Sequence, residues 1–374
     1  MYIEAVKLHN FRNYSQLELT LDERLNFFVG ENAQGKTNLL EALFFAATGR
    51  SFRTRNDEEL IRWGQDSCEV AVRVVHKRGA EKLHLLCRQN PKQKLYSSNG
   101  LQLPRADYLG RLYPVLFTPE DLAIVKGAPQ QRRKFFDEQI SKIYPIYEIE
   151  LKRFSRVLRQ RNRLLKLRQE KSLGSPELES WNEQLAVLGA RIMQRRLFAL
   201  RRLSLLSRLA HRRLTGGEET LVLQYQSAVP LREGAGEDEL QSGILAVLRE
   251  QARREARLGQ TLVGPHRDDV RLLINGKSAH LYASQGQQRT LVLALKLAEI
   301  EFIRGESGEF PLLLLDDVFS ELDGKRRKLL VESIEGRVQT MLTATAAERF
   351  AFFRRSGKLF TITRGEVFPS ESHL

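Results

Sequence analysis

The segment Gly30–Thr37, which reads GENAQGKT, constrains the fold of this chain more than any other stretch of its sequence. It matches the pattern G-x-x-x-x-G-K-[S/T], in which backbone N–H groups and the start of a helix surround a phosphate. The apolar run LNFFV precedes it and TNLLEALFF follows it, so the sequence predicts a strand, a phosphate loop and a buried helix. The alternative is a glycine-rich turn that only caps a helix.

The loop pattern assigns roles to individual residues, because such a loop holds ATP with Mg²⁺. Lys36 is expected to reach the β- and γ-phosphate oxygens, and Thr37 is expected to ligate the metal ion. The expected nucleotide contacts cover the loop and the first residues of its helix: Gly30, Glu31, Asn32, Ala33, Gln34, Gly35, Lys36, Thr37 and Asn38.

A pair of aspartates follows four consecutive leucines in PLLLLDD, residues 311–317. Such leucines fit a strand buried on both faces, neighbouring the strand of the phosphate loop, and ligands lie at the carboxyl ends of such strands. Asp316 is therefore expected to hold Mg²⁺, directly or through water, and Asp317 to polarise the attacking water. Lys36, Asp316 and Asp317 are the expected catalytic residues. The alternative is that the two aspartates only cap the next helix.

Strand and helix patterns alternate at both ends of the chain, whereas helical periodicity dominates its middle. The helical region runs from about 130 to 214 and is broken at Pro145; a strand-like run at 219–229 and a helix around 238–258 follow. We therefore expect an α/β head, with a mixed P-loop sheet, flanking helices and an antiparallel β part, interrupted by a mainly helical lobe. The expected parts are a first head part at 1–128, an inserted basic lobe at 129–259 and a second head part at 260–374.

The distribution of charge points to a polyanionic partner. The formal net charge is +14, and residues 150–213 hold seventeen Lys or Arg against five Glu, a local charge of +12. Five of these cations recur at three- and four-residue steps along one helix face: Lys152, Arg156, Arg159, Arg163 and Lys166. Residues 153, 161 and 168 broaden this stripe. We expect it to contact the phosphates of double-stranded DNA largely without regard to sequence, the alternative being a solvated basic face.

Two further features limit the class of protein. No run approaches the eighteen apolar residues of a membrane span, and the first residues lack the layout of a signal peptide, so we expect a cytoplasmic protein with no membrane partner. Cys68 and Cys87 are its only cysteines and show no CxxC spacing, so we expect them to fill small apolar positions.

A third segment, Ser284–Arg289, places glycine and glutamine in front of a long helical stripe. The phosphate loop, this segment, the paired aspartates and the acidic loop VFSELD follow one another along the chain. This order of motifs resembles that of the ABC-type ATPases, whose signature motif is Leu-Ser-Gly-Gly-Gln. The resemblance implies that Ser284, Gly286 and Gln287 bind the γ-phosphate of ATP held by a second subunit, so that ATP joins a head-to-tail homodimer. Ser284 and Gln287 also fit a plain capping box, which is compatible with that role.

Two positions depart from the transporters of this class. Asp317 stands where transporters usually carry Glu, and its shorter side chain predicts slow hydrolysis. Thr343-Ala344-Thr345 ends a strand-like run without the switch histidine of transporters, and Thr343 or Thr345 is the expected replacement.

Further segments, some of them outside the nucleotide site, narrow the family. The opening segment IEAVKLHNFRNY resembles the first strand and loop of DNA-repair ABC ATPases. Six segments occur in family order and together resemble the RecF family of bacterial recombination-repair proteins: GRSFRT, PEDLAIVKGAPQQRRKFFD, LKRFSRVLRQRN, GPHRDD, SQGQQRT and DDVFSELD. The resemblance implies a weak, DNA-dependent ATPase that dimerises with ATP and binds duplex next to single-stranded gaps. It also implies cooperation with RecR and RecO to help RecA displace single-strand-binding protein.

The same resemblance places Arg12 and Asn13 near the nucleotide, with an ordinary surface loop as the alternative. The group from His266 to Asp269 belongs either to the nucleotide or dimer surface or to a structural ion-pair turn. Two other functions fit the phosphate-site motifs: an ABC transporter ATPase subunit, and an ATP-gated structural adaptor that does not hydrolyse.

Overall fold

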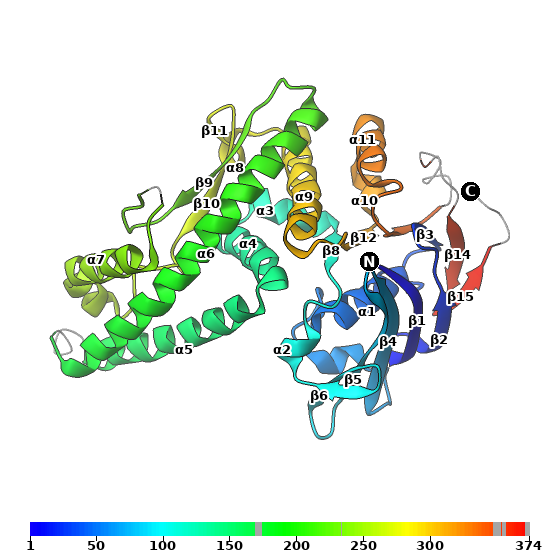
Figure 1. Cartoon of the computed structure of the whole chain (residues 1–374), viewed down its shortest axis with the longest axis horizontal. Coiled ribbons are helices and arrows are strands. Elements are labelled where there is room, and N and C mark those ends of the chain that lie inside the picture. Colours follow the sequence, from blue (N-terminus) through cyan, green and yellow to red (C-terminus); the bar gives the residue numbers. More distant parts are fainter. Residues whose placement is uncertain (169–173, 233, 347–352, 354–356, 371–374) are drawn as a thin grey trace. The chain divides into compact units, whose positions relative to one another are not determined.

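The computed structural model describes residues 1–168, 174–232, 234–346, 353 and 357–370 (Figure 1). The chain forms two compact units. Unit 1 comprises Met1–Asp121 and Val292–Leu374, and unit 2 comprises Leu122–Leu291. None of the described helices is both long and apolar enough to cross a membrane.

The first sheet of unit 1 is antiparallel, with strand order β2-β1-β4-β5-β6-β7. The strands are β1 (Tyr2–Phe11), β2 (Tyr14–Thr20), β4 (Ser67–His76), β5 (Gly79–Arg88), β6 (Gln93–Ser98) and β7 (Leu101–Leu103). Alternate residues of β4 are buried, as the period-two pattern of its sequence requires. Cys68 and Cys87 face each other across β4 and β5 as free, buried thiols, in the small apolar positions expected for them.

The second sheet of unit 1 has the order β15-β14-β3-β13-β12-β8, and it is parallel except for β15. The strands are β3 (Leu25–Val29), β8 (Pro114–Phe117), β12 (Leu312–Asp316), β13 (Thr340–Ala344), β14 (Lys358–Thr363) and β15 (Glu366–Pro369). Leu312–Leu315 are buried throughout, as expected for a strand covered on both faces. The sequence predicted that β12 and β3 are direct neighbours. This prediction is wrong, because β13 lies between them.

The helices of unit 1 include α1 (Lys36–Thr48), which starts at the phosphate loop and ends at Gly49. Gly49 has φ +65° and donates its N–H to Phe45 O, the C-cap that glycine favours. The other helices in the described part of unit 1 are η1 (Asp57–Leu60), α2 (Arg105–Tyr108), α10 (Val318–Glu321) and α11 (Gly324–Ile334). Two helices cross the unit boundary along the chain: η2 (Pro119–Leu122) and α9 (Gln285–Ser307).

The described part of unit 2 is mainly helical and contains a small antiparallel sheet in the order β11-β10-β9. Its elements are α3 (Ala123–Lys126), α4 (Pro129–Ile143), α5 (Pro145–Arg168), α6 (Pro176–Thr215), β9 (Leu221–Gln226), α7 (Glu237–Leu258), β10 (Asp269–Ile274), β11 (Lys277–Ser278) and α8 (Ala279–Tyr282). The expected break at Pro145 separates α4 from α5.

The unit boundaries differ from the expected parts of the chain. The expected second head part began at 260, yet residues 260–291 pack with the insertion as part of unit 2. The reason is the ladder between β9 and β10, which pairs Leu221 with Ile274 at one end and Gln226 with Asp269 at the other. The first boundary falls at 121/122 instead of 128/129.

Candidate nucleotide site

The phosphate loop needs glycine at both ends of its motif. A Cβ on Gly30 would lie 2.3 Å from the backbone oxygen of Ile362. Gly35 has φ +120°, and a Cβ there would lie 2.6 Å from Nδ2 of Asn13. Since both approaches are closer than a Cβ tolerates, these glycines let β14 and the β1–β2 turn close on the loop.

Lys36 folds back onto its own loop. Its Nζ donates to the backbone oxygens of Gly30 at 2.6 Å and Glu31 at 2.7 Å. Burial lowers the pKa of Lys36, and the nearby Asp317 and Asp316 partly oppose this shift. The ammonium group is therefore held inside the curve of the loop.

Asp316 lies where three elements meet. Thr37 at the start of α1 donates its hydroxyl to Asp316 Oδ1 at 3.0 Å, across 279 positions of sequence. Thr343 at the end of β13 donates to the same oxygen at 2.8 Å. Burial raises the pKa of Asp316, while the hydrogen bonds from Thr343 and Thr37 act in the opposite direction. The structure thus brings together Thr37 and Asp316, the two expected metal ligands.

Asp317 does not act as a side-chain cap. It precedes α10 with φ +49°, a left-handed conformation that is uncommon outside glycine, and its carboxylate makes no N-cap hydrogen bond to that helix. Its backbone N–H donates to Thr343 Oγ1 at 3.0 Å. The aspartate that caps a helix here is Asp323, which accepts from the N–H of Arg326 at the start of α11.

Thr343 therefore joins the backbone of one aspartate to the side chain of the other. It is one of the two threonines that the sequence offered in place of a switch histidine. Sequence reasoning missed its contact with Asp316, because it expected no strand between β3 and β12.

Asn13 supports the phosphate loop directly, and Arg12 lies close to it. Asn13 Nδ2 donates to Gln34 O at 3.0 Å, and Asn38 Nδ2 donates to Asn13 Oδ1 at 2.8 Å. Arg12 instead makes a bidentate ion pair with the buried Glu41 of α1, with both N–O distances at 2.9 Å. In this structure, the Arg12 guanidinium is thus engaged with α1.

Sequence reasoning missed Glu41 and two residues around this pair, Ser51 and Arg53. Glu41 Oε1 also accepts from Ser51 Oγ at 2.5 Å. Arg53 Nη1 donates to Asn38 Oδ1 at 2.7 Å and lies 3.5 Å from Glu41 Oε2. Ser51 and Arg53 belong to the segment GRSFRT, whose resemblance to the family was noticed without a role being assigned.

Ser284 and Gln287 form the reciprocal capping box at the start of α9, in unit 2. The Ser284 N–H donates to Gln287 Oε1 at 2.8 Å, and the Gln287 N–H donates to Ser284 Oγ at 3.2 Å. Gln287 Nε2 also donates to Glu219 Oε1 at 2.8 Å, a contact that sequence reasoning missed. Ser284 is exposed and Gly286 is half-buried, so the turn reaches the surface of unit 2.

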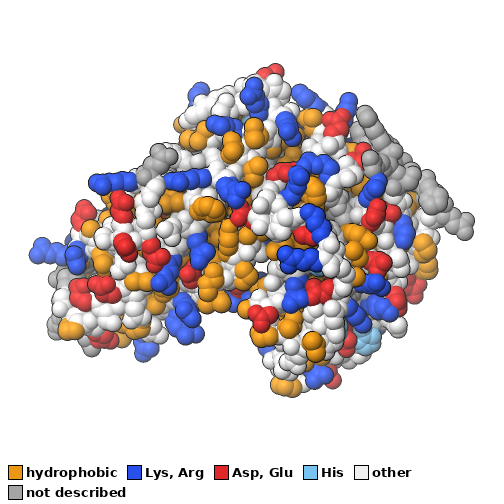
Figure 2. Space-filling model, in the orientation of Figure 1, with side chains coloured by type: hydrophobic (Ala, Val, Ile, Leu, Met, Phe, Trp, Pro, Cys, Tyr) orange, Lys and Arg blue, Asp and Glu red, His pale blue; other side chains and the backbone are white. Residues whose placement is uncertain are grey.

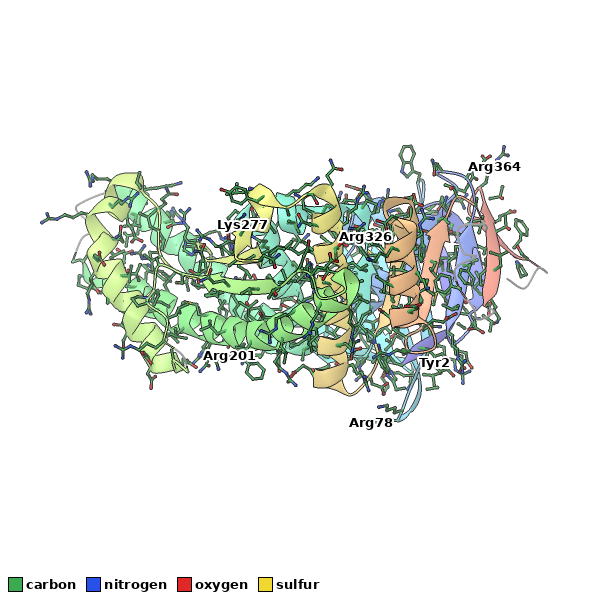
Figure 3. The ribbon with its side chains drawn as sticks, turned by 90° about the horizontal axis from the view of Figure 1, so that it is seen from above. Tyr2, Arg78, Arg201, Lys277, Arg326 and Arg364 are labelled. Atoms are coloured by element: carbon green, nitrogen blue, oxygen red, sulfur yellow. The ribbon has the colours of Figure 1, made fainter. Side chains whose placement is uncertain are left out.

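The predicted basic stripe lies on the exposed side of α5. All five of its residues are exposed: Lys152, Arg156, Arg159, Arg163 and Lys166. Lys152 pairs with Glu148 at 2.7 Å within the helix. Figure 2 shows Lys and Arg side chains, with acidic ones among them, over the region where Figure 1 draws α5 and α7. Arginines also project from α6, as Arg201 does in Figure 3.

Arg161 is not part of this stripe, contrary to the expectation from the sequence. It is 1% exposed, and its guanidinium donates to Glu255 Oε2 at 2.6 Å and to Asn182 and Thr261. At about 100° per residue, position 161 falls on the opposite face of the helix from the stripe. It packs on the same face as Phe154 and Leu165, which are also buried.

The group from His266 to Asp269 belongs to a structural network of unit 2. Arg132 makes a bidentate pair with Asp269, with both N–O distances at 2.8 Å, and Tyr225 donates to Asp268 at 2.5 Å. The ring of His266 packs on that of Phe154 in a tilted arrangement, with centroids 5.7 Å apart, and burial lowers the pKa of His266 to about 4. These contacts favour the ion-pair turn.

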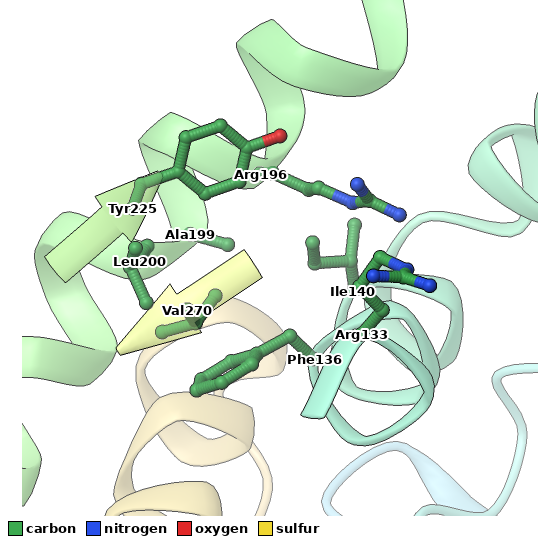
Figure 4. A pocket seen from close by; sticks show the side chains of 8 residues that line it. All are labelled: Arg133, Phe136, Ile140, Arg196, Ala199, Leu200, Tyr225 and Val270. Atoms are coloured by element: carbon green, nitrogen blue, oxygen red, sulfur yellow. The ribbon is translucent and has the colours of Figure 1, made fainter. Parts of the chain in front are cut away.

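A cavity beside this network is lined by eight residues (Figure 4). They are Arg133, Phe136, Ile140, Arg196, Ala199, Leu200, Tyr225 and Val270. Its volume of about 10 Å³ admits about one water molecule, so it is not a ligand site.

The fold and the site of unit 1 define a class of protein. A phosphate loop ends one parallel strand, a carboxylate ends another with one strand between them, and an antiparallel sheet belongs to the same unit. Together with the capping turn before α9, these features define an ABC-type ATPase head.

Comparisons with known proteins identify the family. The family model described as RecF/RecN/SMC N terminal domain matches residues 2–366. The DNA replication and repair protein RecF of Halothermothrix orenii is 45% identical over 351 residues, which cover 92% of each chain. A solved structure of the recombination mediator protein RecF-ATPrS in the RecFOR pathway matches with a TM-score of 0.91 at 34% identity, over 98% of each chain. The chain belongs to the RecF family, the ABC-type ATPases of bacterial recombinational DNA repair.

A more distant structure shares only the fold. The SMC head domain of Pyrococcus furiosus, solved with part of ScpA, matches with a TM-score of 0.57 at 17% identity. That match covers 100% of this chain and 96% of the other.

Proposed function

We propose that this protein is an ATP-dependent DNA-binding ATPase of recombinational repair, in which ATP joins two copies into a clamp on duplex DNA. The observation that carries the proposal is the bond from Thr37 to Asp316, which joins a phosphate loop to a carboxylate across 279 positions of sequence in a chain of the RecF family. A single half-buried carboxylate oxygen that accepts two hydroxyl donors is suited to a hard cation beside a triphosphate.

The residues of this pair fit Mg²⁺, because the ion takes oxygen ligands and few of them need to come from protein. Thr37 and Asp316 would hold it, and when bound it would neutralise charge on the β- and γ-phosphate oxygens. The backbone from Gly30 to Gly35 and the start of α1 would bind the phosphates. Lys36 would exchange its two carbonyl acceptors for phosphate oxygens.

Asp317 would act as the general base that orients and polarises the attacking water. Its left-handed backbone and the bond from its N–H to Thr343 fix its position beside Asp316. Because its side chain is one methylene shorter than glutamate, we expect slow turnover. A slow ATPase would serve as a timer that reopens the dimer.

The lid over each ATP would come from the second subunit. Ser284 Oγ accepts the Gln287 N–H, so the proton of the hydroxyl remains available to a phosphate oxygen. The positive end of α9 would add to this anion site, with Gln287 holding the turn in shape and Gly286 allowing close approach. Two ATP molecules would then hold a head-to-tail homodimer.

The exposed stripe of α5 would hold the DNA backbone. Lys152, Arg156, Arg159, Arg163 and Lys166 would neutralise duplex phosphates without reading bases. By family, the preferred target is duplex beside a single-stranded gap, the partners are RecR and RecO, and the outcome is RecA loading. We place this action in the cytoplasm, where bacterial DNA lies.

Membership of the RecF family decides against the transporter alternative, while the non-hydrolysing adaptor is separated by Asp317→Asn. We expect this variant to bind ATP, because the Asn side chain keeps the size of the aspartate. Turnover should fall by about a hundredfold or more, the contribution of a general base, and the complex with a gapped duplex should last longer. Turnover equal to that of the unaltered protein would contradict hydrolysis at this site.

A further inference from the structure

The carboxylate of Glu219 links the turn before α9 to the end of α6. Glu219 lies in the short connection between the C-cap Gly216 of α6 and β9. Its neighbour Thr220 donates its N–H to Asn275 Oδ1 at 2.8 Å, which anchors the connection to the β9–β10 pair. The end of helix α6 before Glu219 and the anchored start of β9 after it thus hold Glu219 in place.

Each carboxylate oxygen of Glu219 faces a different element. Oε1 accepts from Gln287 Nε2 at 2.8 Å, and Oε2 lies 3.5 Å from Nε2 of His211 on α6. The His211 side chain is fully buried, and burial lowers its pKa, so the ring is neutral at neutral pH. The charge of Glu219 is therefore directed mainly to the Gln287 amide.

The bond to Glu219 decides which way the Gln287 amide points. A carboxylate only accepts hydrogen bonds, so it must face the NH₂ group of the amide. The amide oxygen then faces the Ser284 N–H, where it accepts at 2.8 Å, and the capping box is complete. With the Gln287 N–H on Ser284 Oγ, the hydroxyl proton has no role inside the box.

The cluster is not fully satisfied as it stands. Among the described residues, three buried polar atoms of this cluster have no hydrogen-bond partner: His211 Nδ1, His211 Nε2 and Glu219 Oε2. Buried polar groups without partners are rare in a settled core. The Oε2 side of the carboxylate thus makes no hydrogen bond that would draw Glu219 away from Gln287.

We propose that Glu219 is a positioning residue of the turn before α9: it fixes the Gln287 amide and so aims the Ser284 hydroxyl at the phosphate held by a second subunit. The proposal rests on the ATP-joined dimer proposed above. It goes beyond the dimer itself, because the geometry of the turn then depends on a residue that lies outside the segment Ser284–Gln287, next to helix α6.

The test compares Glu219→Ala with Glu218→Ala, an exposed neighbour that loses the same charge. ATP-dependent dimerisation of Glu219→Ala should weaken by about tenfold to a hundredfold, since a charge-assisted bond is lost twice in each dimer. Glu219→Gln, which keeps an acceptor for the amide, should recover part of the loss. ATP affinity of the dilute monomer should not change, because the phosphate loop belongs to unit 1.

A double-mutant cycle with Gln287→Met separates positioning from loss of folding. If Glu219 acts through Gln287, adding Glu219→Ala to Gln287→Met should cause no further loss of dimerisation. Additive losses, or a Glu219→Ala dimer as stable as that of Glu218→Ala, would overturn the proposal. Failure of the unaltered protein to dimerise with ATP would instead contradict the proposed function.

Discussion

Arg161 illustrates how one residue of a basic segment serves the core instead of the surface. Its neighbours on the stripe are exposed, while its own guanidinium is buried against Glu255, Asn182 and Thr261. A buried charge needs its partner, because the partner left alone would remain in a medium that solvates it poorly. Arg161 and Glu255 should therefore matter for the stability of unit 2 and not for contact with DNA.

Arg161→Met should lower the free energy of unfolding of unit 2 by about 3–5 kcal/mol, because Glu255 stays buried without its cation. Trp181 is a suitable probe, since it packs on Leu164, Leu165 and Leu178, while the other tryptophan, Trp63, is 96% exposed. Denaturant unfolding followed by fluorescence measures the change. Arg159→Met is the matched control and should unfold like the unaltered protein. Equal stability of the two variants would contradict the role given to Arg161.

His266 should make unit 2 less stable in acid. Its folded pKa of about 4 lies below its ordinary value of 6.5, so the unfolded chain binds the proton first as the pH falls. Stability contributed by the neutral ring is present above pH 6.5 and is lost towards pH 4, by up to about 3 kcal/mol. His266→Gln should flatten the pH dependence of unfolding over this window. An unchanged slope would show that His266 is not held neutral.

At the scale of elements, strong local patterns were predictable from the sequence and contacts between distant elements were not. The consecutive leucines Leu312–Leu315 predict a buried strand, and Gly49 predicts the end of a helix, each from its own residue type. The pairing of β9 with β10, which moves residues 260–291 into unit 2, has no local signal. Arg161 was predictable in principle, because helical periodicity alone places it opposite the stripe. The role of Glu219 was not predictable, since no local pattern in the sequence around it indicates a contact with Gln287.

The exposed stripe of α5 makes its own prediction about DNA affinity. If six phosphates are contacted, affinity should fall with salt with a log–log slope of about −5, and each phosphate contact removed should lower the magnitude by about 0.9. Arg163→Ala should reduce the slope in this way. Arg78→Ala, at the exposed turn between β4 and β5 of unit 1, carries the same charge change and should leave the slope unaltered (Figure 3). A slope near zero would remove α5 from the DNA site.

At the scale of the whole molecule, we expect each ATP to be shared by two copies of the chain. One copy supplies the phosphate loop with Lys36, and the other supplies the turn with Ser284. Lys36→Ala and Ser284→Arg should each prevent ATP-dependent dimerisation, because each removes one half of both shared sites. A mixture of the two variants can still form one complete site, between the loop of one and the turn of the other.

Sedimentation of these two variants with ATP and a short duplex, alone and mixed, is the most direct measurement of this claim. We expect monomers for each variant alone and a population of dimers in the mixture, and no dimers in the mixture when ATP is omitted. Dimers of Ser284→Arg alone, or a mixture that stays monomeric while the unaltered protein dimerises, would contradict it.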